Sequence, residues 1–397
     1  MTQHFDLLII GAGPAGLSLA LGLRDLDLKI GIIERQSRQE IAAPKFDGRE
    51  IALTHHSMKL LRAFGLGDTL EPEISILAKA RVEDASSQAY CLNFEPPPNF
   101  NDPLGFLIPN HVIRQTLWDA VAQCPNVTLL DQRTLSHVTT NSVEGRVTTL
   151  NTNKESENFT ARLIVAADNR FSETRRLMGI GASMHDFGRT MMVCRMEHEI
   201  PHHQVALEWF DYGQTVALLP CNGNVTSVVM TLPGHEHAHI MGLDETAFAR
   251  EMESRLKHRC GAMKLVSERF GYPLVGVYAH RFVENRFALC GDAAVGMHPV
   301  TAHGFNFGLI SQEYLGEEIR NAVTAGRDIG NPVGLGRYER RHRLATFPLF
   351  MSTNVVATLF TDDRRPAKLA RQLALRISNN LPFFKQQVAG RLLAHRT

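Results

Sequence analysis

Residues 6–34 read DLLIIGAGPAGLSLALGLRDLDLKIGIIE. The apolar run 6–10 is typical of a buried parallel strand, and leucines recur at helical spacing after the glycine-rich turn 11–16. A second apolar run, 29–33, ends in Glu34. The stretch therefore predicts a strand, a tight turn, a helix and a second strand, which is the βαβ unit that opens a parallel α/β sheet.

The turn has the glycine spacing of a dinucleotide-binding site. Gly11 permits the tight turn, Gly13 lets the backbone approach a pyrophosphate, and Gly16 allows the helix and strand to pack closely. The phosphates then meet free N–H groups at the start of the helix. Glu34 stands where an acid accepts the ribose hydroxyls of an adenosine half. A glycine-rich turn without a ligand is the alternative, and the surrounding strand, helix and acid argue against it.

Two later segments place a carboxylate at the end of a strand. Asp292 follows the apolar run 286–290, and a helical pattern begins after residues 298–308. Such a carboxylate suits the polyol of a flavin ribityl chain, and N–H groups around residues 304–306 suit negative charge on a reduced ring. Asp168 ends another strand, with Arg170 and Arg175 nearby. This group suits a phosphate and sugar site, and a purely structural Gly-Asp turn or ion pair is the alternative for each segment.

Composition limits the classes of function. The chain has 397 residues with 42 basic and 41 acidic side chains, so its net charge of +1 gives no footprint for nucleic acid. Six scattered cysteines form no CxxC pair, which indicates a reducing compartment. The N-terminus has no secretory pattern, and glycines and a proline interrupt the apolar run 7–23. We expect a cytoplasmic protein, at most peripheral to a membrane.

The pattern changes along the chain. Short strand-like runs with one helical stretch at 245–257 fill residues 185–275, which predicts an antiparallel sheet inserted into an α/β frame. The predicted domains are a discontinuous cofactor domain at 1–75, 100–182 and 276–330, a substrate-binding sheet domain at 76–99 and 183–275, and a helical C-terminal region at 331–397.

In this order and spacing, the three segments resemble the flavin-dependent aromatic hydroxylases of the para-hydroxybenzoate hydroxylase type. The resemblance covers nearly the whole chain and is closest to the ubiquinone-biosynthesis ring hydroxylases. A later Y-x-x-x-R pattern fits loosely, because His342 follows Tyr338 where the family has arginine. The other family patterns, D-x-R-x-x-A-L, YPL and HP-x-x-x-x-G-x-N-x-G, are matched by Asp47, Arg49, Ala52, Leu53, Tyr272, Pro273, Leu274, His298, Pro299, Gly304, Asn306 and Gly308.

The resemblance implies a Rossmann-like FAD-binding domain with a parallel sheet, an inserted antiparallel-sheet substrate domain and a helical C-terminus. It implies FAD, with NAD(P)H as a transient reductant, and a flavin C4a-hydroperoxide formed with O₂ that hydroxylates a prenylated phenol or quinol. Pro299 and His303 are expected at the ring face, where they orient or deprotonate the substrate. The expected cofactor-binding residues are Gly11, Gly13, Ala15, Gly16, Glu34, Arg35, Arg49, Arg114, Asp168, Asp292, Gly304, Phe305 and Asn306.

Three departures from the family pattern concern the nicotinamide role and the source of reducing equivalents more than the flavin site. Asn169 replaces a glycine, Val295 replaces a histidine, and residues 301–304 read TAHG in place of Ala-Gly-Gln-Gly. Two other functions stay open. One is a hydroxylase or flavin reductase acting on a small soluble phenol, and the other is a non-catalytic prenyl-binding protein on the same fold.

Two further segments have patterns that lie outside the predicted cofactor site. Residues 235–239 satisfy HExxH, a zinc pattern, but their proline- and glycine-flanked setting predicts a solvated loop and no metal. Residues 364–397 contain eight basic and no acidic side chains interleaved with apolar ones. This pattern suits contact with a membrane or a biosynthetic complex, and a helix packed on the flavin domain is the alternative.

Overall fold

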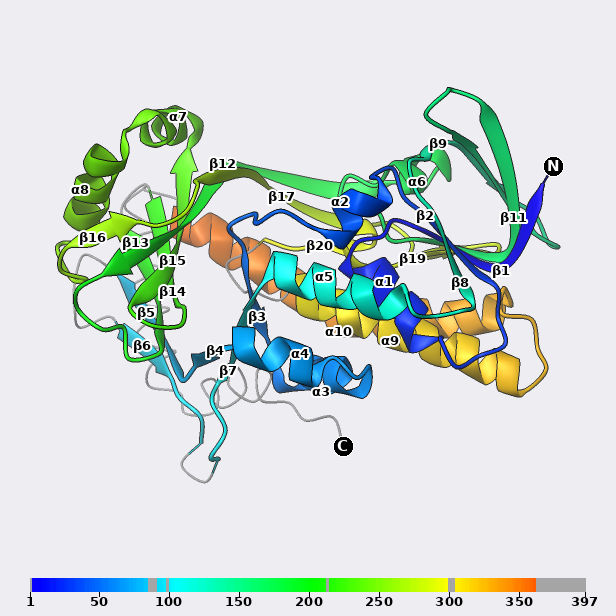
Figure 1. The fold of residues 1–397 in the computed structure, drawn as a ribbon, viewed down its shortest axis with the longest axis horizontal. Coiled ribbons are helices and arrows are strands. Elements are labelled where there is room, and N and C mark those ends of the chain that lie inside the picture. The colour runs from blue at the N-terminus through cyan, green and yellow to red at the C-terminus, as the bar shows by residue number, and fades with distance from the viewer. Residues whose placement is uncertain (1, 85–90, 98–99, 212–213, 299–303, 362–397) are drawn as a thin grey trace.

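A computed structural model describes residues 2–84, 91–97, 100–211, 214–298 and 304–361. Two large sheets and a three-stranded sheet make up its β-structure (Figure 1). Pro299, His303 and the basic tail 364–397 lie outside the described residues. Within the described part of the chain, no helix is both long and apolar enough to cross a bilayer.

The first sheet has a parallel centre, because its strands are apolar on both faces. Leu7, Leu8 and Ile9 are fully buried in the middle strand. The parallel order is β19-β11-β1-β2-β8, and three more strands pair antiparallel at the margins. The strands are β1 (Gln3–Ile10), β2 (Ile30–Ile33), β8 (Val127–Leu130), β9 (Thr134–Thr140), β10 (Gly145–Leu150), β11 (Ser156–Ala166), β18 (Val283–Glu284) and β19 (Phe287–Leu289).

Helices cover this sheet and connect it to the rest of the molecule. α1 contacts both α5 and α9, and α9 contacts the long α10, as Figure 1 shows. The remaining short helices lie in connections. The bounds are α1 (Pro14–Gly22), α2 (Arg38–Ala42), α3 (His55–Ala63), α4 (Gly67–Leu70), η1 (Glu71–Glu73), α5 (Asn110–Val121), α6 (Glu173–Leu177), η2 (Gly291–Ala293), α9 (Gly304–Thr324) and α10 (Pro332–Thr361).

The second sheet has nine strands in the order β20-β17-β12-β15-β14-β13-β5-β6, with β16 paired to β12. All its pairs are antiparallel except β13–β5, which is parallel, so the predicted antiparallel sheet is mixed at that point. The third sheet has the order β3-β7-β4. The strands are β3 (Glu50–Leu53), β4 (Ser75–Leu77), β5 (Lys79–Asp84), β6 (Cys91–Phe94), β7 (Gly105–Pro109), β12 (Ala182–His198), β13 (Val205–Asp211), β14 (Gln214–Pro220), β15 (Val225–Pro233), β16 (Met263–Leu265), β17 (Phe270–Ala279) and β20 (Val295–Gly296).

The strand β12 is longer than the sequence predicts. Only its second half, 191–196, has an apolar pattern. Most of its first half is exposed or half-buried, so apolar periodicity does not predict a strand there. Its pairing with β17 shifts register between Asp186 and Thr190. Figure 1 shows these two strands running from the second sheet toward the first. The predicted domain boundaries stay a prediction, and β20 (Val295–Gly296), predicted within the cofactor domain, pairs with β17 of the second sheet.

The two faces of the second sheet meet different neighbours. On the outer face, Met192, Cys194 and Met196 of β12 pack with helices α7 (Gly234–Gly242) and α8 (Glu245–Arg255). On the inner face, the alternate residue Val193 approaches Gly48, where an added Cβ would lie 2.8 Å from the Val193 side chain. The inner face therefore faces the lobe made by the first sheet and its helices, which we call the first lobe. Alternate residues of a strand point to opposite faces, so Val193 and Met192 meet different neighbours.

The HExxH segment is a helix and not the predicted loop. Pro233 is the N-cap of α7, so the Pro-Gly pair begins a helix in place of the predicted loop. His235 and His239 are exposed, and Glu236 pairs with Arg255 of α8 at 3.4 Å. Among the residues that the structure describes, no three His, Cys, Asp or Glu side chains are grouped to hold a metal.

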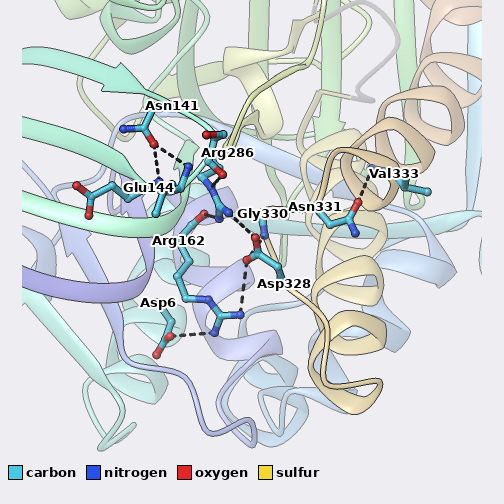
Figure 2. Close-up of polar contacts among 11 residues, drawn as sticks. Asp6, Asn141, Glu144, Arg162, Arg286, Asp328, Gly330, Asn331 and Val333 are labelled. Carbon is cyan, nitrogen blue, oxygen red and sulfur yellow. Dashed lines mark hydrogen bonds and ion pairs between the residues drawn. The ribbon is translucent and has the colours of Figure 1, made fainter.

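Ion pairs close the amino ends of the parallel strands (Figure 2). Arg162 of β11 pairs with Asp6 at 3.2 Å and with Asp328 at 3.6 Å. Arg286 also pairs with Asp328, and it donates to the carbonyl oxygens of Ser142 and Arg162, each at 2.9 Å. We call Asp6, Arg162, Arg286 and Asp328 the amino-edge clamp. It joins β1, β11 and β19 to the connection between α9 and α10.

Candidate functional site

The three motifs singled out in the sequence meet at the opposite, carboxyl edge of the parallel sheet. β1, β11 and β19 are neighbours, so the turns after them lie side by side. A Cβ added to Gly11 would lie 2.6 Å from the carbonyl oxygen of Ala167. A Cβ added to Gly291 would lie 2.7 Å from the Cβ of Ala15 and 3.9 Å from the Cα of Gly308. Segments hundreds of residues apart therefore form one site.

The glycines of the first turn are required for different reasons. Gly11 has a φ of +111°, and Gly16 approaches so closely that an added Cβ would lie 2.1 Å from the carbonyl oxygen of Gly11. Gly13 is different, because it has an ordinary φ of −76° and an added Cβ would meet only the Ala167 oxygen, at 4.0 Å. The fold needs glycine at positions 11 and 16, whereas at position 13 it leaves open space above the backbone.

Glu34 lies at the end of β2 beside this turn. Its carboxylate accepts hydrogen bonds from the backbone N–H of Ala12 at 2.8 Å and of Gln36 at 3.0 Å. Each oxygen keeps a further lone pair for a ligand hydroxyl. Arg114 of α5 donates to the Gln36 side chain at 3.4 Å, while Arg35 is exposed at the rim. Glu34 therefore also fixes the turn, a role that the sequence pattern did not predict.

Only one of the two carboxylate oxygens of Asp168, at the end of β11, accepts hydrogen bonds from described residues. Its Oδ2 accepts from the backbone N–H and the hydroxyl of Thr174, at 3.3 and 3.1 Å. Its Oδ1 is buried without a hydrogen-bond partner among the described residues. A buried acceptor of this kind costs free energy unless something donates to it, so the atom points to a ligand.

The arginines of this segment do not surround Asp168 as expected. Arg175 is 2% exposed and donates to the carbonyl oxygens of Arg170 and Ala293, at 3.2 and 2.9 Å, so it ties the second motif to the third. Arg170 instead pairs with Asp292 at 3.1 Å and donates to the Val275 carbonyl oxygen at 3.2 Å. The sequence placed these side chains near the site but could not give their partners.

A buried polar network supports the turn at Gly291. The Gly291 N–H donates to Ser311 Oγ at 3.2 Å, Ser311 bonds the Tyr338 hydroxyl at 2.8 Å, and Tyr338 donates to the Leu289 carbonyl oxygen. His342 stacks on Tyr338 with an interplanar angle of 11°, and its complete burial lowers its pKa to about 3. The histidine that replaces the family arginine is therefore neutral. Ser311 was missed in the sequence because a serine in a helix gives no signal.

Two motifs separated by 225 residues meet at Asp47. The Asp47 carboxylate accepts from Arg49 Nε at 3.0 Å and from Asn110 at 2.8 Å, and the Tyr272 hydroxyl donates to the Asp47 carbonyl oxygen at 2.7 Å. Burial alone would raise the pKa of Asp47, but these side-chain hydrogen bonds hold it below its usual value. The Arg49 guanidinium lies 5.3 Å from the centre of the Tyr272 ring, so contacts from both lobes fix its position.

The start of α9 completes the carboxyl edge. An added Cβ at Gly304 would meet none of the described residues within 4 Å, and Phe305 is half-buried. The Asn306 side chain is turned away from this space, because it bonds the backbone of Thr54 and Ala52 and the Ser57 hydroxyl. It anchors the helix, while the first backbone N–H groups of α9 supply the positive end of its dipole.

His298, the last described residue before position 304, is buried against an aromatic ring. His298 makes an edge contact with Phe187 of β12, whose ring centre lies 4.5 Å away. Burial, with smaller contributions from Arg170 and His185, lowers the pKa of His298 to about 4. Its imidazole is therefore neutral near pH 7.

Comparisons with known proteins define the class. The chain belongs to the FAD binding domain family, whose sequence profile matches residues 4–345. It is 43% identical over 397 residues to the ubiquinone hydroxylase UbiM of Neisseria meningitidis, covering 99% of this chain and 85% of that one. It is 32% identical over 370 residues to the ubiquinone hydroxylase UbiL of Rhodospirillum rubrum, covering 93% of this chain and 85% of that protein.

Comparison with solved structures agrees with this family. The crystal structure of p-nitrophenol 4-monooxygenase PnpA from Pseudomonas putida matches with a TM-score of 0.80 over 100% of both chains, at 15% identity. The mixed α/β fold and the class predicted from the sequence, an FAD-dependent aromatic-ring hydroxylase, are confirmed. The site fits that cofactor, because Gly13 leaves room for a pyrophosphate and Asp168 Oδ1 offers a buried acceptor.

Proposed function

We propose that this protein hydroxylates the aromatic ring of a prenylated phenol or quinol intermediate of ubiquinone biosynthesis. One observation carries the proposal. The Gly11, Asp168 and Asp292 turns converge at one edge of the sheet in a chain that is 43% identical, along almost its whole length, to a ubiquinone hydroxylase. Once bound and reduced by NAD(P)H, FAD supplies the activation of O₂ and the transfer of one oxygen atom.

The proposed roles of the site residues follow from their positions. The backbone at Gly13 and the first N–H groups of α1 bind the pyrophosphate, with Glu34 at the ribose and Asp292 at the ribityl chain. Arg49 and Arg114 neutralise phosphate charge, and Arg35 lies at the rim. Gly11, Ala15, Gly16 and Asn306 fix the backbone, Gly304 and Phe305 line the ring side, and Asp168 accepts from the cofactor. Pro299 and His303 remain proposed ring-face residues.

The protein's contribution to the chemistry is orientation and exclusion of water. The inner face of the second sheet carries Met191, Val193 and Leu274, which form an apolar cluster with Tyr272 and Phe270. Such a surface suits an aromatic ring with a long hydrocarbon substituent. Because Tyr272 also contacts Asp47 and Arg49, the substrate side and the cofactor side share one wall.

Purified protein tests the proposal. It should be yellow, and with NAD(P)H and O₂ it should add one oxygen atom to a prenylated phenol, as followed by mass spectrometry. A deletion strain should accumulate the unhydroxylated intermediate. A colourless protein that binds the prenylated phenol would instead establish a non-catalytic prenyl-binding protein. Turnover restricted to a water-soluble phenol would establish the small-substrate hydroxylase.

We further propose that the protein works in the cytoplasm at the surface of an anionic membrane. On α10, Leu344 (73% exposed), Phe347, Met351 and Val355 recur on one side of the helix and are exposed. The sequence that follows adds eight basic side chains from residue 364 onward. Flotation with phosphatidylglycerol liposomes should carry the full chain upward, and a chain ending at residue 363 should float less. Equal flotation of both would show that the tail does not contribute to membrane binding, and flotation of neither would remove the membrane role.

A further inference from the structure

Glu208 lies in the middle of β13, within a row of side chains that crosses the second sheet. The register pairs Glu208 with Val82 of β5 on one side and with Ala217 of β14 on the other. From Ala217 the row continues through Val229 and Val193 to Phe270. Directly paired residues of neighbouring strands point to the same face. Apart from Glu208, every member of this row is apolar.

The row belongs to the inner face of the sheet. A Cβ added to Gly48, next to Arg49, would lie 2.8 Å from the side chains of both Val193 and Phe270. The neighbour of Glu208, Trp209, points the other way, because the Arg259 guanidinium lies 3.9 Å from its ring centre. Glu208 therefore faces the first lobe, on the side of the sheet away from α7 and α8.

A second contact agrees with this assignment of the inner face of β13. Ala206, two residues earlier and thus on the same face, packs with Leu77 of β4 and with Leu104.

Glu208 differs from the other buried acids of this region. Glu83 pairs with Arg81 and Arg259, and the Glu50 side chain, only 2% exposed, pairs with Arg195. Glu208 is half-buried, and its carboxyl makes no ion pair or hydrogen bond with any residue that the structure describes. Burial alone raises its pKa to about 8. An uncompensated carboxyl costs stability, and such groups gather at functional sites.

We infer that Glu208 contacts the substrate and is the catalytic residue that bonds the ring hydroxyl and accepts its proton. The inference rests on the proposed function. In this step the phenol O–H bond breaks, the proton passes to a Glu208 carboxylate oxygen, and the electron pair stays on the phenolate. The ring carbon would then form its C–O bond as the O–O bond of the oxygen supplied by bound FAD and O₂ breaks, and the hydrogen of that carbon would leave as a proton to the departing oxygen. The carboxyl would return its own proton to the phenolate oxygen of the product. No additional oxidant or reductant is needed.

A general base with a pKa near the working pH is efficient, because enough carboxylate exists to accept a proton that it binds well. We expect kcat/KM for hydroxylation to rise about tenfold per pH unit below pH 8 and to level off above it. Glu208→Gln keeps the shape of the side chain but cannot accept the proton. It should lower the rate of hydroxylation by about 100-fold or more and remove this pH dependence.

The experiment uses the FAD-loaded full chain and reads several quantities. FAD content, the melting temperature and NAD(P)H oxidation should stay at the wild-type level in Glu208→Gln, with reducing equivalents diverted to H₂O₂. Binding of the prenylated phenol, followed by the flavin absorption spectrum, should lose its pH dependence. Glu208→Asp should restore part of the rate, and Glu197→Gln, at an exposed position of β12, is the matched control.

The outcomes separate the two proposals. If the wild type hydroxylates the ring and Glu208→Gln does so at the same rate with the same pH profile, Glu208 has no such role and the proposed function stands. If Glu208→Gln is slower but keeps the wild-type pH profile, the residue is structural and the inference is wrong. If the FAD-loaded wild type hydroxylates no prenylated phenol at any pH, the proposed function itself fails.

Discussion

The two edges of the parallel sheet are built from the same strands but have opposite characters. At the amino edge, Arg162 and Arg286 satisfy Asp6, Asp328 and two backbone carbonyls. At the carboxyl edge, Gly13 and Gly304 leave open space, and Asp168 Oδ1 is buried without a partner among the described residues. One edge is closed by the protein itself, whereas the other is complete only with a ligand.

The difference shows how stability and function are separated within one sheet. Helix N-termini lie at the carboxyl edge, so N–H groups without an intrahelical partner are available there for an anion. The amino edge has no such task, and it is free to use its polar groups for cross-links. Changes at the two edges should therefore affect different measurements.

The largest expected effect is on cofactor retention at the carboxyl edge. Gly13→Val should abolish FAD binding, because its side chain fills the space for the pyrophosphate. The melting temperature of the apoprotein should stay unchanged, since the Gly13 backbone is ordinary and its Cβ position is open. Absorbance at 450 nm and a thermal melt measure the two quantities. A yellow Gly13→Val protein would show that the pyrophosphate lies elsewhere.

A matched change at Gly16 separates loss of room for the ligand from loss of close packing within the turn. Gly16→Ala should destabilise the fold itself, by about 3 kcal/mol or more, because the added Cβ would lie 2.1 Å from the Gly11 carbonyl oxygen. Urea unfolding of the apoprotein measures this loss. An apoprotein as stable as the wild type would show that the turn relaxes around the methyl group.

Breaking the amino-edge clamp should reverse the pattern. Arg286→Ala removes an ion pair and two hydrogen bonds of a mostly buried guanidinium, so the free energy of unfolding should fall by about 2–3 kcal/mol. The Kd for FAD of the folded protein should not change. Arg320→Ala, which removes an exposed pair with Asp25, is the control and should cost under about 1 kcal/mol. A weaker FAD affinity in Arg286→Ala would mean that the two edges are coupled.

Glu34 tests the ribose side of the site. Glu34→Ala should weaken FAD binding by roughly 1–3 kcal/mol, because it loses the acceptor and loosens the Ala12 N–H. Glu34→Gln keeps an acceptor oxygen and should lose less. Fluorescence titration of the apoprotein with FAD measures both, and unchanged affinity in Glu34→Ala would remove Glu34 from the site.

The smallest expected effect is a pH dependence behind the Gly291 turn. The folded pKa of His342, about 3, lies below its unfolded value of 6.5, so as pH falls the unfolded chain binds the proton first. Stability should decline from about pH 6.5 toward pH 3, and the loss should reach about 1.4 kcal/mol at pH 5.5. His342→Phe keeps the stacking on Tyr338 and should remove this part of the acid sensitivity. Identical acid unfolding curves would refute the assignment.

Local patterns made much of the molecule predictable. The βαβ unit, the strand ends that carry Asp168 and Asp292, and the helix that begins at Gly304 follow from apolar periodicity and glycine positions within short windows. Periodicity failed where burial was low, as in the first half of β12, and where Pro233-Gly234 begins a helix in place of a turn. The first case hid a strand, and the second produced a loop that does not exist.

By itself, the sequence determined the class of fold, the family and the glycines that a bound dinucleotide requires, because these depend on backbone conformation over a few residues. Only the tertiary structure decided that Arg175 points inward, that Asn306 anchors α9 and that Tyr272 reaches Asp47. It also decided that Glu208 lies on the inner face of the second sheet with no partner among the described residues. The physical reason is register. Which face a side chain occupies, and which group it meets, is set by pairing between strands and helices that may be hundreds of residues apart.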